Sequence, residues 1–239
     1  IHPDGVEFAR MKTIFYAHDG AGDKLLVAAV KGGAMRHGDE VSYVQNERFV
    51  GVDESADAAA CYGVRASSRI ILDAYRRAGK RTLFFDKGYL GRGTYTRVAV
   101  DAWQPTKYFR CGRTGERCGE SGLELVFNEL RVDPAKAIYC GTTQTWHDFY
   151  DLGPARAVDE LIVRLLVAHY PKDVIYRPRP AYLKKHPELC GPIPGAALDD
   201  GAQPLREVLR DCRLLVTLGS NAAIEAVACG TEIVVLGDT

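Results

Sequence analysis

Short apolar segments alternate with helix-like segments along most of this chain, and no other feature of the sequence restricts the fold as strongly. A short apolar run is typical of a strand that is buried on both faces. When such strands alternate with helices, they form a parallel sheet that the helices cover on both sides. The sequence therefore predicts an α/β protein.

The alternation occurs in two cycles, separated by an irregular segment at 104–123 that is rich in Gly, Arg and Cys. We expect two Rossmann-like halves with parallel sheets, at 11–130 and 131–239, in a compact or truncated arrangement. The segment 94–103 alternates apolar and polar residues, as an edge strand does. The expected strands lie at 12–17, 40–44, 58–64, 81–85, 94–103, 137–140, 173–176, 214–218 and 232–236.

Helices are expected between these strands. The clearest helical periodicity lies at 154–170, and earlier helices are expected to end at Gly38 and Gly79, where glycine favours a stop. Others are expected at 204–211 and 220–229. The apolar spacing predicts two buried faces, Leu26, Ala29, Val30, Gly33, Ala34 and His37 on the first helix and Val158, Leu161, Ile162, Leu165, Leu166 and His169 on the helix at 154–170.

Charge and hydropathy narrow the function. The 31 basic and 31 acidic side chains balance to a formal net charge of +0, so nucleic acid could be held only by a local basic patch. No apolar run approaches the about 20 residues of a membrane helix, and we expect no membrane span. The scattered cysteines suit buried, reduced thiols in a cytoplasmic protein better than a disulfide framework.

The strongest functional signal lies near the C-terminal end, where a strand runs through a Gly219-Ser220 turn directly into a helix. Small residues at a helix start leave backbone N–H groups open, and the helix dipole favours an anion there. Ser220 can cap the helix and contact a phosphate, with Asn221 and Ala222 beside it. The Glu225 carboxylate can accept hydrogen bonds from a ribose diol. The alternative is a well-capped core helix with an incidental Glu.

Two further segments end expected strands. Arg177 and Arg179 alternate with prolines, so their guanidinium groups are expected to point the same way and to clamp a diphosphate. The alternative is a solvated basic turn. Another strand ends in Gly141, Thr142 and Thr143. Open α/β sheets bind ligands at the carboxyl ends of their strands, which is where both segments lie.

The order and spacing of these elements resemble the C-terminal half of GT-B glycosyltransferases, over roughly 136–238. The nearest resemblance is to capsule Kdo transferases and polyglycerol-phosphate transferases. Those proteins carry an Arg-Pro-His-Pro segment and a later Ser-(small)-(small)-x-Glu-Ala segment that ends in Gly. In that family these segments bind the nucleotide and diphosphate of a sugar donor, in a cleft between two Rossmann-like domains. The resemblance therefore implies a GT-B-like fold.

The resemblance also implies individual roles. Arg179 stands where the family has His, and the chain stops where most GT-B proteins continue with helices that return to the first domain. Nucleotide-sugar 2-epimerases share the fold and much of the donor site, so the resemblance leaves the reaction class open. The donor-binding residues that it implies are Gly141, Thr142, Thr143, Arg177, Arg179, Gly219, Ser220, Asn221, Ala222 and Glu225.

The N-terminal half is expected to supply the acceptor side and the catalytic base. His18 and Asp19 directly follow the first strand. An imidazole that is oriented by a carboxylate can deprotonate an acceptor hydroxyl, and we expect this pair to do so. The alternative is a loop histidine that contacts only solvent.

Asp86 is the rival base, because it ends another strand at the start of an Asp-Lys-Gly-Tyr stretch. That stretch is similar to phage-encoded sugar transferases that decorate DNA bases. The residues expected to contact the acceptor are Lys87, Tyr89, Arg92 and Arg97. If DNA is the acceptor, a basic surface is expected around Arg92, Arg97, Arg110, Arg113 and Arg117.

Other kinds of site are disfavoured. The sequence has no Asp-x-Asp motif for a metal-dependent GT-A mechanism and no Gly-x-Gly-x-x-Gly after the first strand, and Ser220 does not lie in a Gly-x-Ser-x-Gly elbow. Cys111 and Cys118 are spaced too widely for a zinc knuckle. We expect no metal ion and no cofactor other than the donor substrate.

The leading hypothesis is a metal-independent GT-B glycosyltransferase that moves a sugar from a nucleotide-activated donor to a hydroxyl acceptor, either a glycan or a modified DNA base. A nucleotide-sugar epimerase of the same fold would act on the donor alone. A transferase acting on DNA would bind it with a steep salt dependence. A non-enzymatic nucleotide- or nucleic-acid-binding protein would bind without turnover.

Overall fold

A computed structural model describes residues 10–88, 96–103, 136–170 and 173–236. The chain divides into two compact units, unit 1 (Ile1–Cys111) and unit 2 (Gly112–Thr239). Each unit has its own sheet and its own hydrophobic core. The expected boundary at 130/131 lies outside the described residues. The architecture is α/β, with two Rossmann-like halves built on mainly parallel sheets, as predicted.

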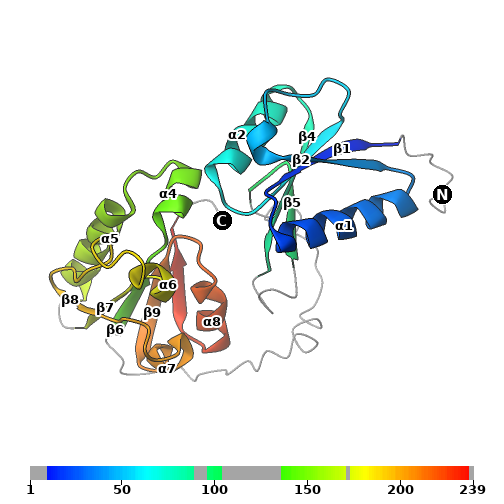
Figure 1. Cartoon of the computed structure of the whole chain (residues 1–239). Helices are drawn as coiled ribbons and strands as arrows, with labels where there is room; N and C mark the ends of the chain where they lie inside the picture. The colour runs from blue at the N-terminus through cyan, green and yellow to red at the C-terminus, as the bar shows by residue number, and fades with distance from the viewer. Residues whose placement is uncertain (1–9, 89–95, 104–135, 171–172, 237–239) are drawn as a thin grey trace. The chain divides into compact units, whose positions relative to one another are not determined.

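Unit 1 is built on one five-stranded sheet (Figure 1). Its strands are β1 (Lys12–Ala17), β2 (Glu40–Gln45), β3 (Ala58–Tyr62), β4 (Arg81–Lys87) and β5 (Thr96–Val100), in the spatial order β2-β1-β3-β4-β5. Neighbouring strands pair in parallel, except that β5 is antiparallel to β4 at the edge. The predicted edge strand at 94–103 is therefore confirmed over its described part.

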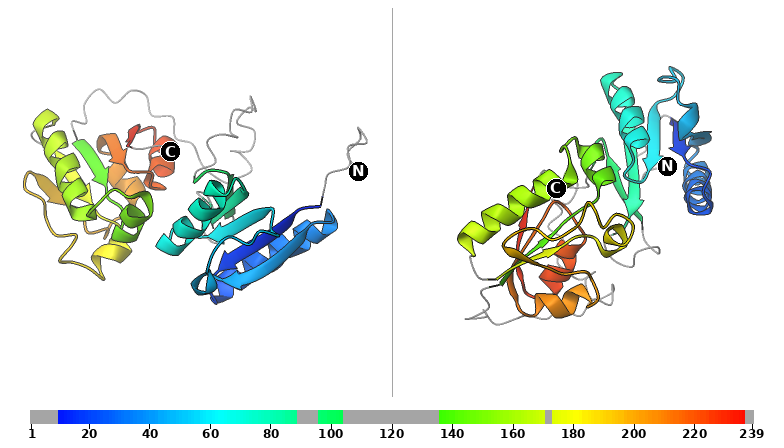
Figure 2. Two further views of the ribbon diagram at one scale, coloured as in Figure 1. Left: turned by 90° about the horizontal axis from the view of Figure 1, so that it is seen from above. Right: turned by 60° about the vertical axis from the view of Figure 1, so that its left-hand side comes forward.

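Helices α1 (Ala21–Arg36) and α2 (Ala66–Arg77) cover opposite faces of this sheet (Figures 1 and 2). Successive side chains of a strand point to opposite faces, which explains the arrangement. Phe15 belongs to the cluster that packs under α1. Its neighbour Tyr16 points the other way, where its hydroxyl lies 3.0 Å from that of Tyr75 on α2.

The buried face of α1 differs from the predicted one. Leu26, Val30 and Ala34 pack against the sheet, but Ala29 and His37 are exposed. Val27 also packs against this cluster, so the buried face of α1 is turned toward Val27 and away from Ala29. His37 is the C-cap residue, and Gly38 ends the helix with φ +83°, a backbone conformation that favours glycine.

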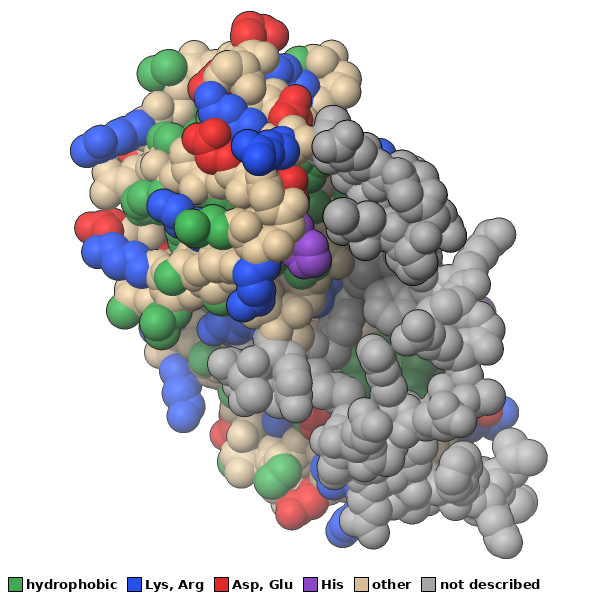
Figure 3. Space-filling view, turned by 90° about the vertical axis from the view of Figure 1, so that its right-hand side faces the viewer, with side chains coloured by type: hydrophobic (Ala, Val, Ile, Leu, Met, Phe, Trp, Pro, Cys, Tyr) green, Lys and Arg blue, Asp and Glu red, His purple; other side chains and the backbone are tan. Residues whose placement is uncertain are grey.

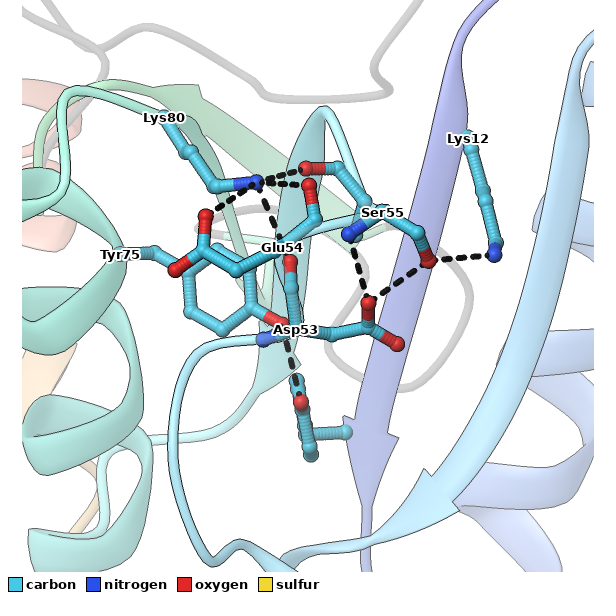
Figure 4. A network of polar contacts seen from close by, with 8 residues as sticks. Lys12, Asp53, Glu54, Ser55, Tyr75 and Lys80 are labelled. Carbon is cyan, nitrogen blue, oxygen red and sulfur yellow. Dashed lines mark hydrogen bonds and ion pairs between the residues drawn. The ribbon is translucent and has the colours of Figure 1, made fainter.

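The amino edge of the unit 1 sheet, where β3 and β4 begin, is held by a partly buried ammonium group (Figure 4). The Nζ of Lys80 donates to the carbonyl oxygens of Asp53, Glu54 and Ala56 at 3.1, 2.8 and 2.6 Å. The hydroxyl of Tyr75 accepts from the backbone N–H of Asp53 at 3.2 Å. These bonds fix the loop before β3, at the edge of the sheet opposite to the carboxyl ends of the parallel strands.

Unit 2 is built on a second five-stranded sheet, in which every neighbouring pair is parallel. Its central strand β6 lies between β9 and β7. The strands are β6 (Lys136–Cys140), β7 (Val174–Arg177), β8 (Ala196–Leu198), β9 (Cys212–Thr217) and β10 (Glu232–Val235), in the spatial order β10-β9-β6-β7-β8.

The helices of unit 2 pack on both faces of its sheet (Figure 1). One face carries the apolar residues of α5, and the other carries residues of α7 and α8. Helices α4 and α6 follow the ends of β6 and β7. The helices are α4 (Gln144–Tyr150), α5 (Ala155–His169), α6 (Pro180–Leu183), α7 (Leu205–Leu209) and α8 (Ala222–Ala228).

The buried face of α5 was predicted incorrectly in part. Ile162 and Leu166 are buried as expected, but Leu161 and Leu165 are more than half exposed. The buried stripe instead includes Asp159, which is only 3% exposed. Apolar periodicity predicts that a carboxylate faces the solvent. The carboxylate of Asp159 is buried instead, because two tyrosines donate hydrogen bonds to it, as described below.

Cysteine burial agrees with the sequence prediction for the described part of the chain. Cys61, Cys140, Cys190, Cys212 and Cys229 are all buried, and no disulfide joins them. The other two cysteines, Cys111 and Cys118, lie outside the described residues. Among the helices that the structure describes, none is long and apolar enough to cross a bilayer.

Candidate functional site

The order of strands in unit 2 identifies a candidate ligand-binding edge. From the central strand β6 the chain proceeds outward through β7 and β8, and then returns to the other side of β6 with β9 and β10. The direction of winding therefore reverses between β6 and β9. In open α/β sheets, ligands bind outside the carboxyl ends of the strands at this switch point. We refer to the segments 141–143 and 219–221, which follow β6 and β9, as the unit 2 edge.

The structure brings these two predicted segments together. Cys140 pairs with Thr217 at the ends of β6 and β9, and the Thr217 hydroxyl donates to the Cys140 carbonyl at 3.0 Å. The residues that follow are therefore neighbours. All six residues of the unit 2 edge are uncharged, and they offer hydroxyl, amide and backbone N–H groups. These are the groups that bind phosphate oxygens in proteins.

Two neighbouring threonines of the unit 2 edge have different roles. The Thr143 hydroxyl accepts from the Trp146 N–H at 3.3 Å and caps α4. Thr142 is 9% exposed, and its hydroxyl has no hydrogen-bond partner in the described part of the chain. A buried hydroxyl without a partner is costly and calls for an explanation, such as a ligand that supplies one.

A buried carboxylate supports the backbone of the unit 2 edge from below. Asp159 accepts hydrogen bonds from the hydroxyls of Tyr139 and Tyr176, both at 2.6 Å. Burial raises the pKa of Asp159, and the two phenol hydrogen bonds act against that rise. A Cβ added at Gly141 would lie 3.2 Å from Asp159 Oδ2 and 3.3 Å from Tyr176 Cε2. The glycine is therefore needed because the chain passes tightly over this group.

The turn after β9 is held by its own residues. Gly219 has φ +92°, which favours glycine, and the Ser220 hydroxyl accepts from the Ala222 N–H at 3.3 Å. Ser220 is therefore not the helix cap that the sequence predicted, because Asn221 is the N-cap residue of α8 and makes no side-chain cap hydrogen bond. Ala222 is buried in the core, and Glu225 is exposed in the first turn of α8.

The two arginines of the Arg-Pro-Arg-Pro segment lie in different environments, contrary to the prediction that they point the same way. Arg177 is 8% exposed, and its Nη1 donates to Asp199 Oδ2 at 2.6 Å while its Nη2 donates to the Gln203 carbonyl at 3.0 Å. Arg179 is exposed and is the N-cap residue of α6. The charge of Arg177 is thus already balanced by a carboxylate that lies 22 residues further along the chain.

Unit 1 has an equivalent switch point. Its chain runs from β1 to β2 on one side and then crosses to β3 on the other. The residues after β1 and β2 are neighbours, because Ala17 pairs with Gln45 at the strand ends. His18 and the short helix η1 (Asn46–Arg48) therefore meet at what we call the unit 1 edge.

The predicted His18–Asp19 pair is not formed. His18 Nδ1 lies 2.5 Å from Glu47 Oε1, whereas Asp19 Oδ1 lies 2.7 Å from Lys24 Nζ. Adjacent residues at a strand end point in different directions, so Asp19 is turned away from the ring and pairs with α1. The carboxylate beside the imidazole is that of Glu47, which the sequence did not predict, and the His18 Nε2 lies 3.5 Å from Asn46 Nδ2.

The first turn of α1 is already occupied by a carboxylate of the chain. Asp23 is 6% exposed and accepts from the backbone N–H of His18 at 3.1 Å. Its Oδ2 lies 3.7 Å from Arg65 Nη1. Burial raises the pKa of Asp23. Because Asp23 puts a carboxylate in the first turn of α1, the charge at this helix start disfavours a phosphate.

Asp86, the rival base, is engaged by a predicted acceptor-binding residue. Asp86 and Arg97 face each other across β4 and β5, and Arg97 Nη2 lies 2.8 Å from Asp86 Oδ2. The carboxylate of Asp86 is therefore engaged by the guanidinium of Arg97. Lys87 is exposed at the end of β4. Tyr89 and Arg92 lie outside the described residues.

The basic surface expected for a DNA acceptor falls largely outside the described part of the chain, since Arg92, Arg110, Arg113 and Arg117 all do. Arg97 is 12% exposed and is paired with Asp86. On the described part of the face in Figure 3, Lys and Arg side chains are interspersed with acidic and apolar ones. These residues form no local basic patch there of the kind that DNA binding would require.

The fold resembles that of a known transferase. No protein-family model matches the chain, and no curated protein matches its sequence. The solved structure of the beta Kdo 2,4 transferase KpsC from Thermosulfurimonas dismutans matches with a TM-score of 0.55 at 12% identity, covering 95% of this chain and 79% of that one. The fold is of the GT-B kind. At this identity the similarity concerns the fold alone.

Two other solved structures match the GT-B fold of this chain more weakly, both with a TM-score of 0.31. One was assigned as a UDP-N-acetylglucosamine 2-epimerase from Listeria monocytogenes, at 14% identity over 97% of this chain and 80% of that one. The other is an ABC transporter solute binding protein from Mycobacterium smegmatis with bound glycerol, at 15% identity over 92% and 70%. A TM-score this low has no bearing on function.

Three residues that make contacts at the unit 1 edge were not predicted from the sequence. Glu47, Asn46 and Asp23 carry its polar contacts, yet none stands in a recognisable motif. The available signal was the end of the second strand, because in a parallel sheet the residues after β1 and β2 must meet. Because positions 46 and 47 are polar and follow the second strand, the sequence allows them to be predicted as partners of His18.

Proposed function

We propose that this chain is a glycosyltransferase that moves a sugar from a nucleotide-activated donor to the hydroxyl group of an acceptor. The observation that carries the proposal is the His18–Glu47 pair at the unit 1 edge, with Nδ1 and Oε1 2.5 Å apart. A carboxylate that accepts from Nδ1 leaves Nε2 unprotonated and able to take a proton. The GT-B fold supports this reading at the level of fold.

The donor nucleotide is assigned to unit 2. The unit 2 edge has uncharged hydroxyl and backbone donors, including the Thr142 hydroxyl without a partner among the described residues. The unit 1 edge is less suited to phosphate, because Asp23 already occupies the first turn of α1. The exposed Glu225 carboxylate and the exposed Arg179 flank the unit 2 strand ends and are proposed to contact the ribose and the phosphates.

The proposed reaction is a displacement at the anomeric carbon of the donor sugar. His18 Nε2 takes the proton of the acceptor hydroxyl, and the acceptor oxygen forms a bond to the anomeric carbon. The bond from that carbon to the phosphate oxygen breaks, and the nucleoside phosphate leaves with the bonding electron pair. Uncharged hydroxyl and backbone N–H donors, of the kind that the unit 2 edge offers to a phosphate, can stabilise the charge that develops on such a leaving group. The proposal includes no cofactor beyond the donor.

The test begins with a panel of uridine, guanosine, thymidine and cytidine nucleotide sugars, each with a mixture of glycan acceptors. Released nucleotide and glycosylated product are measured together. The expected result is product formation with one donor, a loss of about 100-fold or more in kcat for His18→Ala, and little change for Asp19→Asn. Equal activity of wild type and His18→Ala would overturn the assignment of the base. Donor turnover without any acceptor would instead indicate hydrolysis or epimerisation.

A further inference from the structure

Asn46 is the buried neighbour of the proposed base. It is 4% exposed, and its Nδ2 lies 3.5 Å from His18 Nε2 and 3.2 Å from the Ser67 hydroxyl. Its Oδ1 is buried and has no hydrogen-bond partner within the described chain. A buried amide that uses only its nitrogen leaves half of its hydrogen-bonding capacity unmatched.

The unmatched oxygen has a use once His18 is protonated. In the neutral ring Nδ1 donates to Glu47, so Nε2 is an acceptor and matches the amide nitrogen of Asn46. In the imidazolium Nε2 is a donor and matches the amide oxygen. A half-turn of the amide group about the Cβ–Cγ bond of Asn46 exchanges the positions of its oxygen and its nitrogen and leaves the rest of the side chain in place. The Ser67 hydroxyl suits both orientations, because it can accept from the nitrogen or donate to the oxygen.

We propose that Asn46 is a positioning residue whose amide turns over with the protonation of His18, donating to the neutral ring and accepting from the imidazolium. This inference rests on the proposed role of His18 as the base that removes the acceptor proton. A hydrogen bond to a charged group is stronger than one to a neutral group. Asn46 therefore stabilises the protonated ring that the transfer step produces, and holds its plane fixed in both states.

The charged groups around His18 do not act at Nε2. Glu47 on η1 contacts Nδ1, and Asp23 on α1 accepts the backbone N–H of His18. Arg65 lies 3.7 Å from Asp23. Asp19 pairs with Lys24. Among the contacts that the described residues make, Asn46 is the one at the nitrogen that exchanges the proton.

The test is an NMR titration of the His18 ring in wild type, Asn46→Asp and Asn46→Ala, without substrate. Aspartate copies the shape of asparagine and presents oxygen permanently, so it is expected to raise the measured pKa of His18 by about 1–3 pH units. Alanine removes the acceptor for the imidazolium and is expected to lower the proton affinity at least about threefold. The ring signals of His37, which is exposed at the end of α1 and away from these substitutions in the sequence, serve as the internal reference in the same spectra.

An unchanged His18 pKa in both variants would overturn the inference. If Asn46→Ala does not fold, the isosteric Asn46→Asp decides by itself. A second readout is the pH profile of transfer, whose lower limb is expected to move upward in Asn46→Asp by the amount that the titration gives, with activity recovering at high pH. The titration needs no turnover, so its outcome is independent of the transfer assay. Full transfer activity of His18→Ala would refute the role of His18 as the base, but it would not change the result of the titration.

Discussion

Glu47 Oε1 lies 2.5 Å from His18 Nδ1, although the two residues are 29 positions apart and a nearer carboxylate, Asp19, follows His18 directly. The contact follows from the parallel pairing of β1 with β2, which aligns Ala17 with Gln45 and sets η1 beside His18. Sheet register, and not sequence proximity, thus selects the carboxylate that orients the imidazole.

Replacement of that carboxylate tests its role. In Glu47→Gln the amide no longer stabilises the imidazolium, so kcat of sugar transfer is expected to fall about 10- to 100-fold with little change in thermal stability, since Glu47 is 63% exposed. Asp19→Asn is the matched control and is expected to retain near-normal activity. A larger loss in Asp19→Asn than in Glu47→Gln would reverse the assignment.

Arg177 is expected to matter for stability and not only for ligand binding. Arg177→Ala leaves Asp199, whose side chain is 14% exposed, without its partner, and the free energy of unfolding is expected to fall by about 3 kcal/mol. The double variant Arg177→Met, Asp199→Leu removes both charges and is expected to recover at least half of that loss in urea unfolding. If Arg177→Ala unfolds like wild type, the ion pair contributes nothing measurable.

Gly141 is expected to tolerate no side chain. In Gly141→Ala the added methyl meets Asp159 Oδ2 at 3.2 Å and Tyr176 Cε2 at 3.3 Å, so the loop must shift at a cost of about 1–3 kcal/mol in unfolding free energy. Nucleotide-induced stabilisation is expected to weaken with it. Gly32→Ala is the control, because a Cβ there meets nothing within 4 Å, and it is expected to stabilise α1 by about 0.5–1 kcal/mol.

Acid is expected to destabilise unit 2 through His147. This residue is 0% exposed, and burial lowers its pKa, with weaker opposing effects from Asp148 and the Gly153 backbone. The unfolded chain therefore binds a proton that the folded chain does not. Stability is lost as the pH falls below the ordinary histidine value of about 6.5, and the loss stops below the lowered pKa of the folded state.

The measurement is the midpoint of urea unfolding at pH 7.5 and pH 5 for wild type and His147→Phe. The variant keeps an aromatic ring in the core but cannot titrate, so its midpoint is expected to fall less between the two pH values than that of wild type. Other histidines contribute equally to both proteins and cancel in the comparison. An equal fall in both proteins would mean that His147 does not carry the acid sensitivity.

Much of the fold follows from the sequence because strands and helices are local. The alternation of apolar runs predicts both sheets, and the two segments predicted to bind a ligand, after β6 and β9, do lie side by side. Side-chain partners are less predictable because they depend on register and loops. The burial of Arg177 depends on Asp199 in a distant loop, and the buried face of α5 depends on two tyrosines that hold Asp159 inside. The spacing of residues within a single helix or strand cannot predict contacts with partners on other segments.

We propose that the unit 2 edge binds the donor nucleotide, and Ser220 allows a direct test of this binding. Ser220→Asp preserves an acceptor for the Ala222 N–H at the start of α8 but adds a negative charge that repels phosphate. Ser220→Asn has nearly the same shape without the charge. Both variants are expected to keep the thermal stability of wild type.

The measurement is calorimetric titration of the three proteins with nucleoside diphosphates and cytidine monophosphate. We expect one nucleotide to bind wild type and Ser220→Asn with similar affinity and to bind Ser220→Asp at least about tenfold more weakly, a difference of about 1.4 kcal/mol. Binding of that nucleotide to Ser220→Asp with wild-type affinity, or binding of no nucleotide to wild type, would contradict it.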